Sequence, residues 1–401
     1  MKSISLAPPE RKAPFAHPMR LALRPWLDGI AHGTLRLRLP NGEMLEARGG
    51  PGPDASLALN DWRAVRRLLL QGEIGFAEGF VAGDWTTPDL VALLRLGALN
   101  SPEITGLTGG IAHRIATHLR HWLHGNTRRG SRRNIVSHYD LGNDFFALWL
   151  DSTLLYSSAL YDDRATTLEQ AQQNRLARIL ALMDLRGGEH VLEIGCGWGA
   201  LALHLAQAGA GAITGLTLSP SQLEVAQKRC ASAPVELRLQ DYRDVAGTYD
   251  RVVSIEMIEA VGEAWWPTYF GKIAEVLRPG GTALIQAITI DESRFDDYRA
   301  RPDFIQRHIF PGGFLPTKTA IAEQTARAGL RVVRTESFGL SYAQTLADWR
   351  ARFDARWSEI AALGFDERFR RLWTYYLCYC EAGFLEGATD VGFTLLQKPE
   401  A

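Results

Sequence analysis

The sequence predicts an α/β protein, with a class I, Rossmann-like domain preceded by a smaller α+β domain. Its 401 residues exceed the usual size of one hydrophobic core, so two domains are expected. From Asn134 onward, short β-type runs alternate with helical patterns, which is typical of βαβ units in a parallel sheet with helices on both faces. One run leads into three alternating glycines and then a helix, as at the cofactor turn of Rossmann-like folds.

The N-terminal domain is expected over residues 20–125. Alternating side chains between Gly33 and Arg48, interrupted by the turn residues Pro40-Asn41-Gly42, predict a β-hairpin. Helical spacing of apolar residues predicts helices over Asp61–Gln71 and Asp89–Leu99. Together these elements predict a small α+β domain.

A basic linker is expected over residues 126–133, which lack an apolar period. Its four arginines either contact anionic headgroups or stay solvated, and the sequence favours neither: Arg128, Arg129, Arg132 and Arg133. The larger domain is expected over 134–401. Its predicted strands are His190–Cys196, Ala212–Leu218, Val235–Asp241, Arg251–Met257, Thr282–Ile290, Val332–Phe338 and Val391–Gln397. A long helical stretch, Ala343–Leu385, is expected to form a helical lid over the strand ends.

Composition excludes several classes of protein. A net charge of −1 gives no reason to expect a nucleic-acid partner. The four cysteines have no C-x-x-C spacing, so no metal site is expected. No run approaches the roughly 18 apolar residues of a membrane span, and residues 1–15 lack the apolar core of a signal peptide. A cytoplasmic location is therefore expected, with peripheral membrane contact if the substrate is a lipid.

The glycine turn predicts the cofactor. The order is Glu193-Ile194-Gly195-Cys196-Gly197-Trp198-Gly199, so an acid precedes the glycines. Glycine lets the backbone approach a ligand closely, and the helix start offers free amide donors. The carboxylate of Glu193 would repel a phosphate but suits an ammonium group, which favours S-adenosylmethionine over a dinucleotide. The alternative is a tight strand–helix turn without a ligand.

Several segments in family order resemble the cyclopropane fatty acid and mycolic acid synthase family. They are His138-Tyr139-Asp140-Leu141-Gly142-Asn143-Asp144-Phe145-Phe146, Leu155-Tyr156-Ser157-Ser158-Ala159, the glycine turn, Gly215-Leu216-Thr217-Leu218-Ser219 with Gln222, Ile309-Phe310-Pro311-Gly312-Gly313, and Thr374-Tyr375-Tyr376-Leu377. The stretch from Gly72 to Trp85 looks like the extra domain of the branch that acts on bacterial phospholipids.

The resemblance implies a substrate, a cofactor site and an assembly. The substrate is an unsaturated acyl chain of a membrane phospholipid, whose double bond attacks the sulfonium methyl and leaves a carbocation. A homodimer is also implied. The implied cofactor contacts are Tyr156, Ser157, Gly195, Cys196, Gly197, Thr217, Leu218, Gln222, Tyr242 and Arg243.

The resemblance also implies a bicarbonate ion that removes a proton from the new methyl group, so that a ring closes. Of its five protein contacts, three are retained here and two differ: Glu259, Ile288 and Tyr376 are kept, whereas Ser158 replaces a Cys and Gln286 a His. These changes weaken the case for bound bicarbonate. Glu256 adds a carboxylate where the family often has a small residue. We hypothesise that it replaces the external base and that a methyl-branched alkene forms.

Two alternatives remain open at this point. One is a true cyclopropane synthase in which the substitutions have no consequence. The other is a catalytically inactive relative that binds cofactor or lipid, against which the retained Glu259, Tyr376 and glycine turn argue. A small-molecule methyltransferase would leave the N-terminal domain without a purpose.

Overall fold

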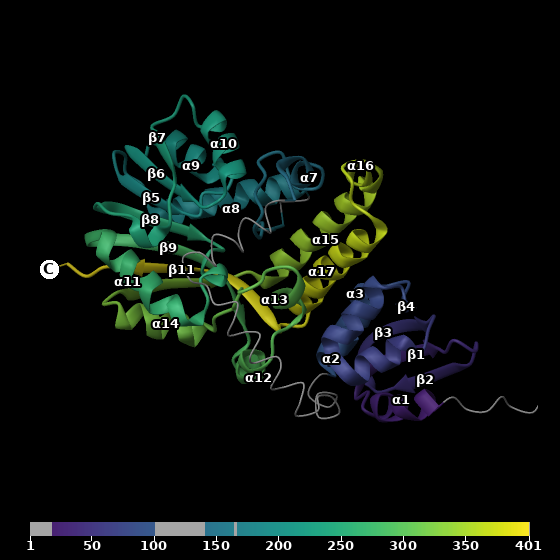
Figure 1. Cartoon of the computed structure of the whole chain (residues 1–401). Helices are drawn as coiled ribbons and strands as arrows, with labels where there is room; N and C mark the ends of the chain where they lie inside the picture. Colours follow the sequence, from purple (N-terminus) through teal and green to yellow (C-terminus); the bar gives the residue numbers. More distant parts are fainter. Residues whose placement is uncertain (1–17, 101–140, 164–166, 401) are drawn as a thin grey trace, which may run out of the picture.

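The computed structural model describes residues 18–100, 141–163 and 167–400. Within these ranges the chain forms a four-stranded sheet near the N-terminus and a seven-stranded sheet in the remainder. The two sheets lie at opposite ends of the molecule, with the long helices α15 and α17 between them (Figure 1). No helix in the described ranges is long and apolar enough to cross a membrane. The predicted linker and the boundary near 125 lie outside these ranges and stay predictions.

The N-terminal unit contains the predicted hairpin and a strand that the sequence did not reveal. β1 pairs antiparallel with β2 as expected, whereas β3 pairs with β1 in parallel. β3 begins with Gly50-Pro51-Gly52-Pro53, residues that normally mark a turn. Its second half buries alternate side chains against the helices. The unit comprises α1 (Pro18–Asp28), β1 (His32–Arg38), β2 (Met44–Arg48), β3 (Gly50–Leu59), α2 (Arg63–Val81), β4 (Trp85–Thr86) and α3 (Leu90–Leu99).

α2 runs ten residues beyond the predicted end at Gln71, because the chain kinks at Gly72 and then continues as a helix. Gly72 has φ 60° and ψ −137°, a conformation that only glycine adopts without strain. The second half of α2 is anchored by Trp85, whose indole stacks on Phe76 at 4.2 Å and donates to the Phe76 carbonyl at 2.8 Å.

The seven-stranded sheet has the order β10-β11-β9-β8-β5-β6-β7. All seven predicted strands are present, but the prediction of a wholly parallel sheet is wrong for one of them. β11 runs antiparallel to both β9 and β10, because the chain returns through α15–α17 and enters the sheet between them. The strands are β5 (His190–Ile194), β6 (Ala212–Thr217), β7 (Val235–Leu239), β8 (Tyr249–Ile255), β9 (Leu277–Ile290), β10 (Arg331–Ser337) and β11 (Thr389–Gln397).

Helices cover both faces of this sheet, as strand alternation requires. Val191 of β5 packs in one core with residues of α8 and α9, and its neighbour Leu192 packs in another with residues of α11 and α14. The helices of this part are α7 (Asn143–Ala147), α8 (Leu168–Met183), α9 (Ala200–Gln207), α10 (Pro220–Arg229), α11 (Trp266–Val276), α12 (Phe295–Ala300), α13 (Phe304–His308) and α14 (Lys318–Arg327). Short 3₁₀ turns are η2 (Tyr242–Asp244), η3 (Ile258–Ala260), η4 (Glu263–Trp265) and η5 (Glu292–Arg294).

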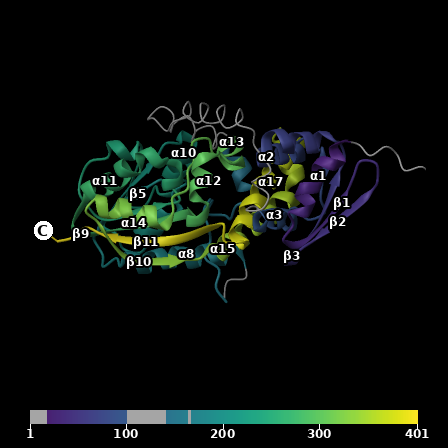
Figure 2. The ribbon, with the colours of Figure 1, turned by 90° about the horizontal axis from the view of Figure 1, so that it is seen from below.

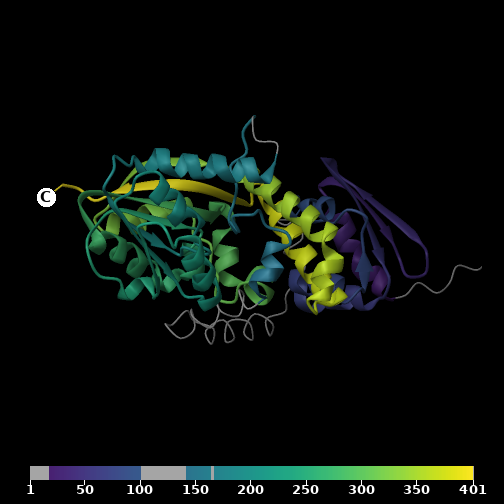
Figure 3. The same cartoon turned by 90° about the horizontal axis from the view of Figure 1, so that it is seen from above.

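The predicted helical stretch forms α15 (Gly339–Ala355), α16 (Trp357–Ala362) and α17 (Glu367–Leu385). α15 packs on α17, and α17 also packs on α2 and α3 of the N-terminal unit. Figures 2 and 3 show these helices between the two sheets from opposite sides. Arg371 donates to the Phe80 carbonyl at 3.0 Å, and the Phe80 ring lies 5.7 Å from Tyr375. α17 therefore packs on the N-terminal unit, and α15 and α17 both contact β11 of the seven-stranded sheet.

Candidate active site

One cavity of about 1060 Å³ extends from the carboxyl ends of the parallel strands into the N-terminal unit. It opens where the strand order reverses between β5 and β8, the usual ligand position in open α/β sheets. Small-molecule pockets span roughly 300–1,000 Å³, so this cavity has room for a cofactor and a further apolar ligand. Its N-terminal part is lined by leucines of β1 and β3, such as Leu35, Leu37, Leu57 and Leu59.

The glycine turn after β5 lines the cavity with bare backbone. Gly195 has φ 84° and Gly197 has φ 51°, both in the left-handed region that favours glycine. A Cβ on Gly195 would lie 2.6 Å from the Cγ of Met257, so a larger residue does not fit. The loop is held by β6, because the amides of Gly195 and Cys196 both donate to the Leu216 carbonyl at 3.0 and 2.8 Å.

Glu193 lies just below this turn with one unsatisfied carboxylate oxygen. Its side chain is 3% exposed and lines the cavity, and its Oε2 has no hydrogen-bond partner among the described residues. Burial raises the pKa of Glu193 to about 8, although the Arg175 guanidinium partly opposes this. A buried acceptor without a donor fits a cationic ligand. The ammonium group of S-adenosylmethionine supplies such a cation, so the residues present fit this cofactor.

The other predicted cofactor residues line the same cavity, with one exception. Those on the cavity are Tyr156, Ser157, Thr217, Leu218, Gln222 and Tyr242. The Thr217 hydroxyl donates to Gln222 Oε1 at 3.1 Å, which fixes the end of β6 against α10. Arg243 does not line the cavity. Its guanidinium pairs with Asp241 at 2.6 Å and lies over the Trp265 ring at 5.4 Å, so its charge is already engaged.

Glu256, at the end of β8, collects three hydrogen-bond donors. Its Oε1 accepts from the Ser158 amide at 2.8 Å and from Gln286 Nε2 at 2.7 Å. Its Oε2 accepts from the Tyr342 hydroxyl at 2.8 Å. Glu256 lines the cavity and has φ 48°, a left-handed conformation that costs a non-glycine residue roughly 1–2 kcal/mol. Strain of this kind is concentrated at functional sites.

Ser158 and Gln286 are fully buried and do not line the cavity themselves. The Ser158 hydroxyl donates to the Ala159 carbonyl at 2.9 Å, so only the backbone amide of Ser158 donates to the Glu256 carboxylate. The side-chain oxygen of Gln286, Oε1, accepts from Arg175 Nη1 at 3.4 Å. The donors at these two positions, which the resemblance assigns to bicarbonate, are thus engaged by the carboxylate of Glu256.

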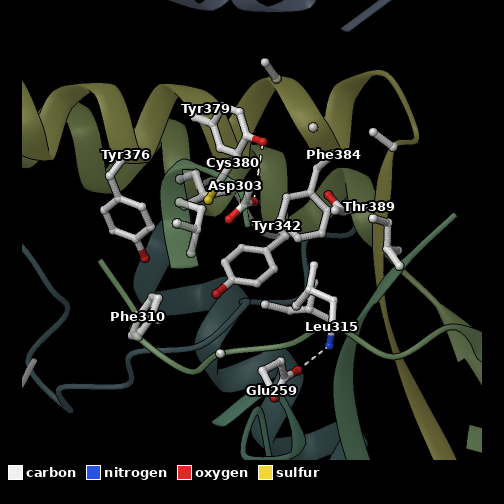
Figure 4. Close-up of a pocket in the computed structure, with 18 of the residues that line it drawn as sticks. Glu259, Asp303, Phe310, Leu315, Tyr342, Tyr376, Tyr379, Cys380, Phe384 and Thr389 are labelled. Carbon is white, nitrogen blue, oxygen red and sulfur yellow. Dashed lines mark hydrogen bonds between the residues drawn. The ribbon is translucent and has the colours of Figure 1, made fainter. Parts of the chain in front are cut away.

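Glu259 forms a second buried carboxyl group, on the turn η3. Its Oε1 accepts from the Ile288 amide at 2.5 Å, and within the part of the chain that the structure describes its Oε2 has no hydrogen-bond partner. Figure 4 shows Tyr342 and Tyr376 on the helical side of the cavity and Glu259 on the opposite side. Tyr376 exchanges a hydrogen bond of 2.8 Å with the hydroxyl of Tyr156. Aromatic faces and carboxyl groups therefore enclose one apolar space.

The two carboxyl groups share one electrostatic environment. Burial raises the pKa of both, to about 8 for Glu259, and the neighbouring Glu256 raises that of Glu259 further. The Ser158 amide, the Tyr342 hydroxyl and the Arg175 guanidinium act in the opposite direction on the pKa of Glu256. We infer that Glu256 carries the charge and Glu259 the proton near neutral pH, because Glu256 has three donors and Glu259 has one.

Two residues of this site were not found by sequence reasoning. Tyr342 comes from α15 and Arg175 from α8, each far in sequence from Glu256. Arg175 is 1% exposed and lines the cavity, and its Nη2 atom has no hydrogen-bond partner in the described ranges. No local motif marks either residue. An arginine among the apolar positions of an otherwise amphipathic helix was the only available signal.

The strand order, the glycine turn and the unpaired Glu193 define the class: this is an S-adenosylmethionine-dependent methyltransferase with a Rossmann-like core. Comparison with known proteins gives the particular family. The family described as mycolic acid cyclopropane synthetase matches residues 126–393. The chain therefore belongs to this family of lipid-modifying enzymes.

Individual relatives carry two kinds of name. The chain is 41% identical to "Tuberculostearic acid methyltransferase UfaA1" of Mycobacterium tuberculosis, over 92% of this chain and 88% of the relative. It is 36% identical to "Cyclopropane-fatty-acyl-phospholipid synthase" of Escherichia coli K12, over 80% and 81%. The crystal structure of mycolic acid cyclopropane synthase CmaA1 complexed with SAH and CTAB aligns with a TM-score of 0.63 at 30% identity, covering 67% of this chain and 98% of that one.

Proposed function

We propose that this enzyme methylates a double bond in an unsaturated acyl chain of a membrane phospholipid and leaves a methylated chain that keeps a double bond. One observation carries the proposal: the Glu256 carboxylate occupies the donors of Ser158 and Gln286 at the cavity wall. A built-in base at this position makes an external bicarbonate unnecessary. The enzyme would work in the cytoplasm, from the inner face of the membrane, as its substrate requires.

The chain's own residues support each step of this reaction. When bound between the glycine turn and Glu193, S-adenosylmethionine would supply an electrophilic methyl group, and its sulfur would keep the electrons of the broken S–CH₃ bond and leave as S-adenosylhomocysteine. The π electrons of the acyl double bond form the new carbon–carbon bond, and a carbocation remains on the chain. Tyr342 and Tyr376 face that space and stabilise a cation through their rings and oxygens. Glu256 accepts the proton that the cation loses, and the electrons of that C–H bond restore a double bond.

A cyclopropane product is the second candidate, because the site retains Glu259, the Ile288 amide and Tyr376. In that reaction the proton leaves the transferred methyl group and a ring closes in place of the alkene. An inactive relative that binds cofactor or lipid is the candidate from another class. The retained glycine turn on the cavity gives that candidate no support.

The test combines trideuteromethyl S-adenosylmethionine with dioleoyl phospholipid vesicles in bicarbonate-free buffer. Proton NMR of the isolated acyl chains is expected to show olefinic signals and no cyclopropane signals. The number of deuterons retained in the lipid then identifies the carbon that lost the proton. Cyclopropane signals, or turnover that requires added bicarbonate, would overturn the built-in base. Cofactor binding without any labelled lipid would establish the inactive relative.

A further inference from the structure

A group of charged side chains lines the otherwise apolar cavity where it meets solvent, since Glu73, Asp297 and Arg301 are exposed. Glu73 contributes from α2, just after the Gly72 kink, and Arg294, Asp297 and Arg301 contribute from α12 and its two ends. Positions 294, 297 and 301 follow helical spacing, so one face of α12 is turned to the cavity. Figures 1 and 2 both place α12 beside α2, at the junction between the catalytic sheet and the N-terminal unit.

Three of these side chains are exposed to solvent and interact with one another only through their charges. Among the residues that the structure describes, the side chains of Glu73, Asp297 and Arg301 make no hydrogen bond and no ion pair within 4.0 Å. Arg294 donates to the Ala98 carbonyl at 3.0 Å, which anchors the start of α12 to the end of α3. Exposed charges at the opening of an apolar cavity are placed to contact the polar end of a ligand whose apolar part enters the cavity.

The residues around Glu73 indicate what kind of chemical group could bind there. Its side chain lines the cavity and is accessible to solvent there, although protein atoms surround it closely. This partial desolvation raises the pKa of Glu73, and the charges of Arg294 and Arg301 partly lower it. Asp303 at the start of α13 and Tyr379 of α17 lie near Glu73; burial raises the pKa of both, the charge of Glu73 raises it further, and the Tyr379 hydroxyl donates to Asp303 at 3.5 Å (Figure 4). The same cavity is also lined by leucines of the N-terminal sheet and by the aromatic residues of the reaction space.

We propose that this charged group is a headgroup subsite for a glycerophospholipid, a proposal that rests on the proposed function. The guanidinium groups of Arg294 and Arg301 bind the phosphodiester, since guanidinium donors match phosphate oxygens. The carboxylates of Glu73 and Asp297 accept hydrogen bonds from the group esterified to that phosphate. An ethanolamine ammonium has such donors, whereas the quaternary nitrogen of choline has none. The subsite therefore selects donor-bearing headgroups over choline.

The test compares dioleoyl phosphatidylethanolamine with dioleoyl phosphatidylcholine, which are both zwitterionic and carry the same chains. Each is presented at equal density in mixed vesicles of saturated phosphatidylcholine, and the readout is kcat/KM for methyl transfer. The wild-type enzyme is expected to prefer the ethanolamine lipid by about tenfold, the effect of one charge-assisted hydrogen bond. Arg301→Gln is expected to raise KM for it by about tenfold. Asp297→Asn is expected to remove the preference.

Matched controls lie on the same helix. Arg299 pairs with Glu263 and Asp296 is exposed, and neither lines the cavity. Arg299→Gln and Asp296→Asn are therefore expected to behave as wild type, with cofactor affinity unchanged in all four variants. If the cavity variants match these controls, or if inorganic phosphate competes as well as glycerophosphoethanolamine, the headgroup subsite is wrong. Equal methylation of both lipids also refutes it while the proposed function stands. No methylation of either lipid refutes both.

Discussion

Replacing Glu256 by Gln removes the proposed base while keeping the local hydrogen bonds. A glutamine oxygen in the Oε1 position still accepts from the Ser158 amide and from Gln286, at the present 2.8 and 2.7 Å. A glutamine nitrogen in the Oε2 position donates to the Tyr342 hydroxyl, which reverses the direction of the present 2.8 Å bond. The change therefore removes a charge and leaves packing and the hydrogen-bond count unaltered.

The expected result is a folded enzyme with a greatly reduced rate. A positioned general base contributes about 100- to 10,000-fold, so kcat for methyl transfer is expected to fall by that factor. The cofactor dissociation constant is expected to stay within about threefold, because Glu193 is untouched. The assay follows transfer of tritiated methyl from S-adenosylmethionine to dioleoyl phospholipid vesicles, with thermal unfolding as the measure of folding.

Glu259→Gln provides the contrast. The pKa of Glu259 is raised to about 8, so this group is largely protonated at pH 7 and an amide already resembles it. Its carbonyl oxygen keeps the Ile288 amide as a partner. A loss of less than about tenfold in kcat is expected at pH 7, far below the range for a general base. Our reasoning is refuted if Glu256→Gln keeps a rate within threefold of wild type, or if Glu259→Gln is the more damaging change.

Three further predictions concern residues around these carboxyl groups. Arg175→Met removes a guanidinium that lowers the pKa of Glu256, so the acid limb of the kcat/KM profile is expected to move to higher pH. Because the pKa of Glu193 is raised to about 8, cofactor binding at pH 7 is expected to release about one proton, and the affinity for the cofactor is expected to rise up to pH 8. Calorimetry in two buffers of different ionisation enthalpy measures the proton release, which the Glu193→Gln variant is expected to lack. Gly195→Ala is expected to lower the melting temperature and weaken cofactor binding, since left-handed backbone costs roughly 1–2 kcal/mol before the Met257 clash.

Each of these predictions has a control in the same element or class. Arg178 also lies on α8 but pairs with Glu336 near the surface, so Arg178→Met should leave the pH profile in place. Gly271 lies inside α11 with no atom within 4 Å of its missing Cβ, so Gly271→Ala should stabilise the protein by about 0.5–1 kcal/mol. A wild-type pH profile for Arg175→Met, or equal effects of the two glycine changes, would contradict the assigned roles.

The strands of the large sheet were predictable because each is a short apolar run bounded by turn residues. The antiparallel direction of β11 could not be predicted, because the sequence of a strand does not show which two strands it will pair with. β3 was missed because proline and glycine at its start mark a turn in most contexts. In this strand they tolerate the parallel pairing with β1, and only the later alternation of Ala55, Leu57 and Leu59 carries the β pattern.

The candidate site was predictable to the extent that it is local. Glu193 and the glycine turn are neighbours in the chain, so their order alone predicted a site for a cationic ligand beside glycine backbone. The surroundings of Glu256 depend instead on Ser158, Gln286 and Tyr342, which three separate elements bring together. Arg243 was assigned to the cofactor by resemblance and stays a prediction; its guanidinium pairs with Asp241, and the residue does not line the cavity.

The left-handed backbone at Glu256 is kept by the hydrogen bonds that its carboxylate accepts. Glycine adopts φ 48° freely, so Glu256→Gly would relieve a strain of roughly 1 kcal/mol. The same exchange would leave the Ser158 amide, Gln286 and the Tyr342 hydroxyl without their acceptor, and each such buried donor costs about 1–3 kcal/mol. The strained conformation therefore persists, because the residue that would relax it would take away both the base and more stability than the strain consumes.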